Sequence, residues 1–297
     1  MGPSKPPRIA RRRRSAWAIS IYTGDSPISL SSPAGLRNPV FTDEHVTDFP
    51  ADFVADPFMV WEAGQWWMFY EVFNGATARG EIGLATSSDG FAWQYAGLVL
   101  REPFHLSYPY VFRSGEDYYM IPETLDLGAI QVYRAEPFPN RWRPIAKLLE
   151  GSFADSSIFR YQDRWWMFSC TNHSLHDTVC LYQSPELLGP WTAHPSNPIL
   201  EGDRTRARPG GRVTEWNGRL LRFAQDCVPQ YGTHVRAFEI EELTPTTYRE
   251  RELPESPILS PGNDWNRSGM HHVDPHPLPG GGWIACVDGY FMRDPEP

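Results

Sequence analysis

A repeated unit in this sequence of 297 residues constrains the fold more than any other feature. The first unit runs from FVADPFMVWEAGQWWMFYEVFN through GEIGLATSSDG to FAWQYAGLVL, which predicts four strands separated by short turns. Equivalent positions in the first strands of five such units are Asp56, Tyr108, Asp155, Arg208 and His271. These positions are 52, 47, 53 and 63 residues apart, and four strands in a unit of this length are typical of a β-propeller blade.

The two ends of the chain are predicted to share one blade. The fifth unit, MHHVDPHPLPGGGWIACVDGY, supplies only two strands before Pro297. The missing strands are predicted in WAISIY and in the NPVF region near the N-terminus, and their pairing would remove an exposed sheet edge. The sequence therefore predicts an all-β fold: a single five-bladed β-propeller over residues 17–297, closed by N-terminal strands. A solenoid is the competing repeat fold, but its units are usually shorter and need no terminal sharing.

Charge and composition exclude several function classes. Residues 1–16 contain Arg11 to Arg14 after a proline-rich start and are predicted to be a disordered basic tail, with a phosphate or membrane contact as the alternative. A net charge of −9 argues against a general nucleic-acid binder. No apolar run approaches the roughly 18 residues of a transmembrane segment. The four cysteines lack metal-type spacing and are interpreted as free thiols in a reducing cytosol, which predicts a cytoplasmic protein.

Polar residues recur at the blade positions that would face the propeller axis. The first strands carry the five positions given above, and the ends of the second strands return to the same face with a second polar set. The second set consists of Glu71, Glu123, Asn172, Asp226 and Asp288. Because buried charges are costly unless paired, the two sets together predict a ligand site at the mouth of the central channel. For any single acid, the alternative is a turn cap or a pair with arginine across blades.

Three of these segments resemble a family of enzymes. FVADPFMV, FADSSIF and the Gly-Met-His-His sequence that ends at His272 resemble the arabinanase- and xylosidase-type five-bladed glycoside hydrolases. The resemblance covers the blades from roughly Phe53 to Tyr290. It implies that Asp56 is a general base and that Asp155 orients the substrate and tunes the site.

A closer resemblance extends over nearly the whole chain. The sequence is similar to the propeller region of glucosamine inositolphosphorylceramide transferase-like proteins, through FVADPFMV, IGLATSSDG, EPFHLSYPYVF, YYMIPET and the WWMF strand with its preceding Asp-Ser. The resemblance implies a setting in glycoconjugate or glycolipid synthesis. It implies no particular reaction, because in those proteins the transferase domain is separate.

The fourth blade departs from the hydrolase pattern. Where arabinanase-type enzymes carry a general-acid Glu, this sequence has RARPGGRV, which places Arg206 and Arg208 there. Arginine stays charged and cannot serve as a proton donor, but it can hold a phosphate or carboxylate. Arg206, Arg208 and Arg212 would form an anion pocket together with His271 and His272. The alternative is that the arginines neutralise nearby acids.

If the site is catalytic, the proton donor must come from another blade. We expect Glu123 to be the acid, because an apolar and aromatic mouth would raise its pKa. Asp56 would then activate water or an acceptor hydroxyl, and Asp155 would orient the sugar or Asp56. The remaining polar residues are predicted to bind the ligand. They are Glu71, Tyr108, Asn172, Arg206, Arg208, Asp226, His271, His272 and Asp288.

No cofactor or metal is predicted, although a cation on the axis near His271 is an alternative. Asp274 and His276, together with the two preceding histidines, form a cluster without a standard zinc spacing. In the predicted loop over the mouth, His176 is expected to face solvent. Trp265 is expected to stack on a sugar.

Three functions are compatible with these residues. The first is an enzyme that hydrolyses or transfers a glycosidic bond on a glycoconjugate. The second is a non-catalytic propeller that recognises a sugar or glycolipid beside a glycosyltransferase partner. The third is a glycosyltransferase-like enzyme that binds a phosphorylated sugar donor. All three predict a carbohydrate or sugar-phosphate ligand.

Overall fold

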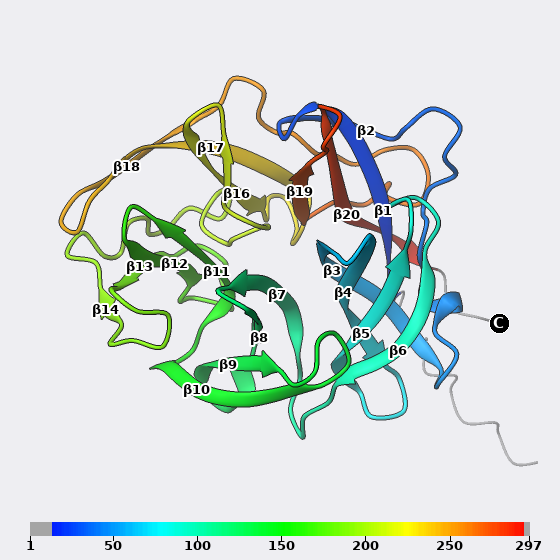
Figure 1. Cartoon of the computed structure of the whole chain (residues 1–297). Helices are drawn as coiled ribbons and strands as arrows, with labels where there is room; N and C mark the ends of the chain where they lie inside the picture. The colour runs from blue at the N-terminus through cyan, green and yellow to red at the C-terminus, as the bar shows by residue number, and fades with distance from the viewer. Residues whose placement is uncertain (1–13, 294–297) are drawn as a thin grey trace, which may run out of the picture.

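The structure is a computed structural model that describes residues 14–293 (Figure 1). Five four-stranded antiparallel sheets form a ring, with the first strand of each sheet nearest the axis. This confirms the predicted five-bladed β-propeller. Most of the predicted basic tail, residues 1–13, lies outside the described residues. Arg14 to Ala16, which were assigned to that tail, instead begin a strand.

Each blade is built from four strands, and the bounds follow the chain. Blade one contains β3 (Ala51–Glu62), β4 (Gln65–Asn74), β5 (Arg79–Ser87) and β6 (Gln94–Leu100). Blade two contains β7 (Ser107–Ser114), β8 (Asp117–Glu123), β9 (Ala129–Ala135) and β10 (Trp142–Glu150). Blade three contains β11 (Ala154–Tyr161), β12 (Arg164–Cys170), β13 (Val179–Ser184) and β14 (Thr192–Ala193). Blade four contains β15 (Thr214–Trp216), β16 (Arg219–Asp226), β17 (His234–Leu243) and β18 (Tyr248–Glu252). Blade five contains β19 (Val273–Pro277), β20 (Trp283–Arg293), β1 (Arg14–Ser26) and β2 (Ser29–Ser31).

Blade five joins the two ends of the described chain. β1 pairs with β20 without a break from Arg14 opposite Arg293 to Gly24 opposite Trp283. The predicted closure by N-terminal strands is therefore confirmed, with one correction. The outermost strand is β2 rather than the NPVF region, because a tight hairpin follows β1 directly, and Phe41 makes only an isolated bridge to Ile19.

The turns between first and second strands follow from local sequence. Ala63 and Gly64 join β3 to β4 with φ of 53° and 80°, and Asn217 and Gly218 join β15 to β16 with φ of 51° and 73°. Two successive left-handed residues match the twist of an antiparallel hairpin, and asparagine and glycine adopt this conformation most easily.

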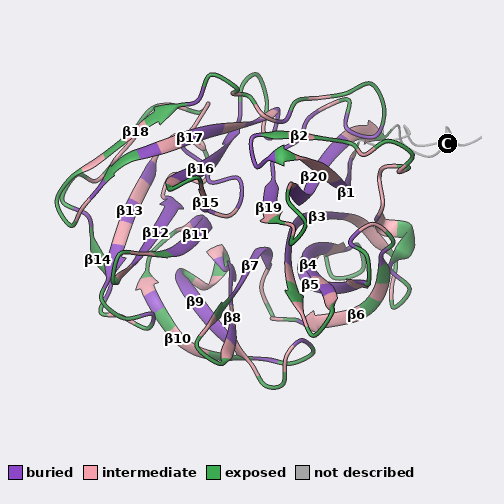
Figure 2. Ribbon diagram, turned by 45° about the horizontal axis from the view of Figure 1, so that its top comes forward, coloured by how far each residue is buried: buried purple, intermediate pink, exposed green. Residues whose placement is uncertain are grey.

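The core lies between neighbouring blades. Buried residues follow the inner strands, and exposed residues follow outer strands such as β18 (Figure 2). Trp66 and Trp165, which occupy equivalent blade positions, are 6% and 7% exposed, as expected for residues packed between sheets. Two short 3-10 helices, Asp43–His45 and Leu125–Leu127, are the only helices in the described part of the chain. Neither could cross a membrane.

Candidate functional site

Asp56, Tyr108 and Asp155 share an unusual backbone conformation at equivalent positions of blades one, two and three. Their φ angles are 52°, 47° and 49°, in the left-handed region that residues other than glycine rarely adopt. Each lies in a β-bulge, where the pairing of the first strand with the second shifts register. A bulge takes a residue out of the regular ladder, so its side chain and N–H group are free to turn toward other blades.

Carboxylates from the preceding blade in the ring bind these three N–H groups. The Asp56 N–H donates to Asp288 Oδ2 over 2.9 Å, and the Tyr108 N–H donates to Asp56 Oδ2 over 3.2 Å. The Asp155 N–H donates to Glu123 Oε2, also over 3.2 Å. Three of the axial acids therefore hold the bulge of the next blade, which compensates part of the strain of the left-handed residues.

A pocket of about 230 Å³ opens among these acids. Five predicted site residues line it: Asp56, Glu71, Glu123, Arg208 and His271. The other lining residues are Trp17, Phe53, Ala55, Phe73, His105, Ser107 and Tyr231. The pocket thus combines carboxyl groups with aromatic walls.

Burial raises the pKa of three lining acids. It raises the pKa of Glu123 to about 8, with the Asp155 charge acting in the same direction and Arg208 opposing it. Burial raises the pKa of Asp56 to about 7, and His271 opposes this rise. The pKa of Glu71 lies well above its usual value, again because of burial and the nearby Asp56 charge. A carboxyl that keeps its proton at neutral pH can donate it, so Glu123 has the property expected of an acid.

The Arg208 guanidinium is paired with two acids. Its Nε donates to Asp155 Oδ2 over 2.5 Å, and its Nη2 donates to Glu123 Oε2 over 3.2 Å. The guanidinium also lies over the ring of Tyr231, 5.2 Å from its centre. Asp155 does not line the pocket, and its carboxylate contacts the site through Arg208. Arg208 therefore neutralises nearby acids, as the alternative to an anion pocket expected.

His271 also lines the pocket. Its Nδ1 lies 2.8 Å from Asp288 Oδ1, and its ring stacks on Trp17 with 4.1 Å between ring centres. Burial favours the neutral ring, but the Asp288 carboxylate outweighs burial and raises the pKa of His271. Nε2 faces Asp56 Oδ1 at 3.7 Å.

Among the described residues, Asp56, His271 and Asp288 form one group with ligand atoms within 4.8 Å of one another. A protonated imidazole has no lone pair for a metal, so the raised pKa of His271 fits an ion pair better than a cation site. The cluster considered around Asp274 is also an ion-pair network, because Asp274 binds Arg212 at 2.6 Å and His276 at 2.9 Å. The absence of a metal stays a prediction, with the axial cation as its alternative.

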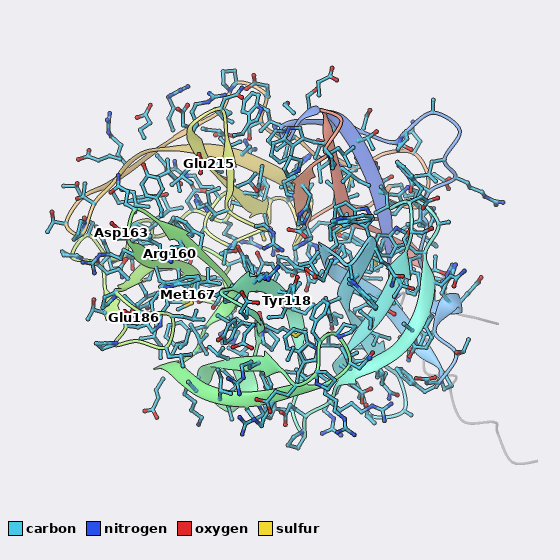
Figure 3. The ribbon with its side chains drawn as sticks, in the orientation of Figure 1. Tyr118, Arg160, Asp163, Met167, Glu186 and Glu215 are labelled. Carbon is cyan, nitrogen blue, oxygen red and sulfur yellow. The ribbon has the colours of Figure 1, made fainter. Side chains whose placement is uncertain are left out.

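Tyr108 and His272 lie inside the ring and do not line the pocket. Both are fully buried, and their rings meet edge to face with 5.4 Å between centres. The Tyr108 hydroxyl accepts a hydrogen bond from the Gly211 N–H over 2.8 Å and lies 2.8 Å from Ser157 Oγ. Side chains therefore fill the gap that the ribbons leave at the axis, as Figure 3 shows. The expectation that these two residues contact a ligand is wrong for this pocket, because the interior holds them.

Asn172, Arg206 and Asp226 also lie outside the pocket, each with a local partner. Asn172 Nδ2 donates to Asp177 Oδ1 over 2.8 Å. Arg206 Nε donates to Asp203 Oδ2, and Arg236 Nε donates to Asp226 Oδ2, both over 2.8 Å. Since Arg212 binds Asp274, the three arginines of the predicted anion pocket do not converge, and that prediction is wrong.

His105 and His176 lie at the site, although the sequence did not identify His105 as a site residue and predicted His176 to face solvent. His105 Nδ1 accepts a hydrogen bond from the Gly80 N–H over 2.8 Å, which leaves Nε2–H to face Glu71 Oε1 at 3.3 Å. His176 was expected to face solvent, but it is half-buried and its Nδ1 lies 3.0 Å from Arg208 Nη1. His105 lies in the EPFHLSYPYVF segment, and the resemblance of this segment to the transferase-like family could have identified His105 as a site residue. No local sequence feature distinguishes His176.

The aromatic walls were also missed. Trp17 was recognised only as part of a strand, and Tyr231 lies in a loop between β16 and β17. Trp265, the residue expected to stack on a sugar, is instead 8% exposed and belongs to a core cluster with Met270 and Val287. The expected role of Trp265 is therefore wrong.

The sequence matches a family model over residues 10–290, described as Glucosamine inositolphosphorylceramide transferase 1, N-terminal. The rice protein Glucosamine inositolphosphorylceramide transferase 1, from Oryza sativa subsp. japonica, is 36% identical over 296 residues. That match covers 92% of this chain and 40% of the rice protein, so the chain spans well under half of its relative.

Two solved structures share the fold at low sequence identity. A thermostable family-43 glycoside hydrolase has a TM-score of 0.62 and 18% identity, with 86% of this chain and 92% of that chain covered. The β-1,2-mannobiose phosphorylase from Listeria innocua has a TM-score of 0.65 and 13% identity, with 90% and 96% covered. At these identities the likeness concerns the fold alone.

Proposed function

The chain belongs to the family of the N-terminal region of glucosamine inositolphosphorylceramide transferase 1, and on that premise we propose that its axial pocket cleaves or transfers a terminal sugar of a glycoconjugate. The observation that carries the proposal is the set of buried carboxyls with raised pKa beside aromatic walls. The pocket is smaller than the roughly 300 to 1,000 Å³ of sites for drug-sized ligands, which favours a single sugar ring.

Glu123 and Asp56 divide the chemistry in this proposal. As the bond from the anomeric carbon to the leaving oxygen breaks, Glu123 gives its proton to that oxygen. A water or acceptor hydroxyl forms the new bond, and Asp56 takes its proton. Asp155 keeps Arg208 in place beside Glu123, and the Arg208 charge supports Glu123 once it has lost its proton.

The pH dependence follows from the two pKa values. Asp56 is ionised above about 7 and Glu123 is protonated below about 8, so the working form is most populated between these values. Because the two carboxyls interact, a bell-shaped profile would report the pair rather than either residue.

A sugar-binding propeller without catalysis is the second candidate, because the same pocket could hold a sugar for a glycosyltransferase domain. The relative is named a transferase, and this chain covers only 40% of it. A phosphorylated sugar donor has little support as the ligand, because the Arg208 guanidinium is already paired with two acids.

Asp56→Asn and Glu123→Gln test the proposal. Each should abolish turnover of 4-nitrophenyl glycosides, offered as a panel of neutral and amino sugars, while the free energy of unfolding stays within about 2 kcal/mol of wild type. Release of nitrophenol and thermal denaturation are the measurements. Asp226→Asn is the control, because Asp226 is a buried carboxylate at the equivalent blade position outside the pocket.

The outcomes separate the two candidates. Full activity in either pocket variant would show that the assigned roles are wrong. Sugar binding that both variants weaken, without turnover by the wild-type protein, would favour the recognition function.

A further inference from the structure

Asp288 is the buried acid that contacts Asp56 and His271 at once. It is fully buried at the blade-five wall and has no exposure to a ligand. Oδ2 accepts the N–H of Asp56, and Oδ1 accepts the N–H of His271 over 3.3 Å and faces His271 Nδ1 at 2.8 Å. A single carboxylate therefore fixes the bulge that presents Asp56 and the ring that faces it.

The other end of His271 points at an unsatisfied oxygen. Asp56 Oδ1 has no hydrogen-bond partner among the described residues, although Asp56 is only 5% exposed. His271 Nε2 lies 3.7 Å away, which is too long for a hydrogen bond but close enough for charge attraction. Trp17 stacks on the ring and limits its rotation.

We propose that Asp288 and His271 form a positioning pair for Asp56, in which Asp288 fixes the Asp56 backbone and keeps a charged imidazolium beside its free oxygen. This inference rests on the proposed function, in which Asp56 takes the proton. Neither member of the pair exchanges atoms with the substrate. Their effect is to favour the ionised form of Asp56 and to hold its carboxylate in the right orientation despite its burial.

Other charged groups around Asp288 and His271 also influence whether Asp56 and His271 are ionised. The charged or titratable groups that face Asp56 or His271 are Glu71, Glu123, Asp155, Arg208, Tyr231, His272 and Asp288. Arg208 is already paired with Asp155 and Glu123, which leaves His271 as the cation that faces the free Asp56 oxygen. Removing the Asp288 charge should therefore make His271 neutral. The lost His271 charge then raises the pKa of Asp56 by more than the lost Asp288 charge lowers it, because His271 is the stronger of the two influences.

Nuclear magnetic resonance titration of the His271 ring tests this without a substrate. In the wild-type protein with 13C-labelled histidine, the His271 midpoint should lie above its usual value of about 6.5. His271→Gln identifies the signal. In Asp288→Asn the midpoint should fall by about 1 to 3 units, because the opposite charge is lost. Asp226→Asn is the matched control and should leave the midpoint unchanged, since Asp226 pairs with Arg236.

A wild-type midpoint below 6.5 would overturn the inference, and this result does not depend on whether Asp288→Asn folds. An unchanged midpoint in folded Asp288→Asn would also overturn it. If a glycoside is turned over, the acidic limb of kcat/KM should move to higher pH in Asp288→Asn and stay in place in Asp226→Asn. Failure of the proposed function is a separate result: Asp56→Asn would then keep full turnover, whatever the titration of His271 shows.

Discussion

At the residue scale, strain and charge are concentrated in the same few positions. Asp56, Tyr108 and Asp155 adopt a left-handed backbone that costs of order 1 to 3 kcal/mol each in residues other than glycine. Their N–H groups receive carboxylate partners that the neighbouring blade must supply. The protein therefore keeps acids buried near the axis, where burial raises the pKa of Asp56 and Glu123. Such an arrangement is expected at a functional site and rare in a purely structural core.

The raised pKa values predict a loss of stability with rising pH. An acid whose pKa is higher in the folded than in the unfolded protein stabilises the fold fully at low pH, and this contribution disappears as pH rises through the folded value. Between pH 6 and 9, the melting temperature of the wild-type protein should therefore fall more than that of Glu123→Gln, which cannot ionise at this position. Calorimetry across this range is the measurement. Parallel curves for the two proteins would contradict the raised pKa of Glu123.

At the element scale, the contact between blades four and five depends on a glycine. Gly211 makes a parallel bridge to Val273, and its N–H donates to the Tyr108 hydroxyl. A Cβ at Gly211 would lie 1.8 Å from the Val273 carbonyl oxygen, and its φ of 139° disfavours other residues. The RARPGGRV segment that departs from the hydrolase pattern thus also fits two blades together at the axis.

Gly211→Ala should consequently destabilise the propeller by about 2 to 5 kcal/mol, through a backbone clash and strain. Gly280→Ala is the matched control, because a Cβ there meets no atom within 4 Å. Urea denaturation of both variants measures the difference. Equal stability of the two would show that blades four and five can separate at this point without cost.

At the scale of the whole molecule, the ring is closed by hydrogen bonds between β1 and β20 rather than by a covalent link. All four cysteines are free thiols; Cys170, Cys227 and Cys286 are buried, and Cys180 is half-buried. A cytoplasmic location stays a prediction. β1 also buries Ile19 and Ile21 completely, and it brings Trp17 to the pocket. Closure and the site therefore depend on the same strand.

Removal of residues 1–31 should open the ring. β20 would then present an unpaired edge, and the apolar partners of Ile19 and Ile21 would be exposed to water. We expect the truncated protein to aggregate or to lose its cooperative thermal transition, as followed by size-exclusion chromatography and circular dichroism. Removal of residues 1–13 alone is the control and should preserve the transition. A monomeric, cooperatively folding product of the longer deletion would contradict the role of β1.

The sequence alone determined the five blades and their closure, because strand spacing and turn residues are local properties that repeat along the chain. It also placed Asp56, Glu123 and His271 near one another, since equivalent blade positions must converge on one axis. Only the tertiary structure decided which of these side chains reach the pocket. Tyr108 has the same bulged backbone as Asp56, yet its side chain packs into the axis. Arg208 binds acids rather than an open anion site, because its partners come from blades 53 and 85 residues away in the chain.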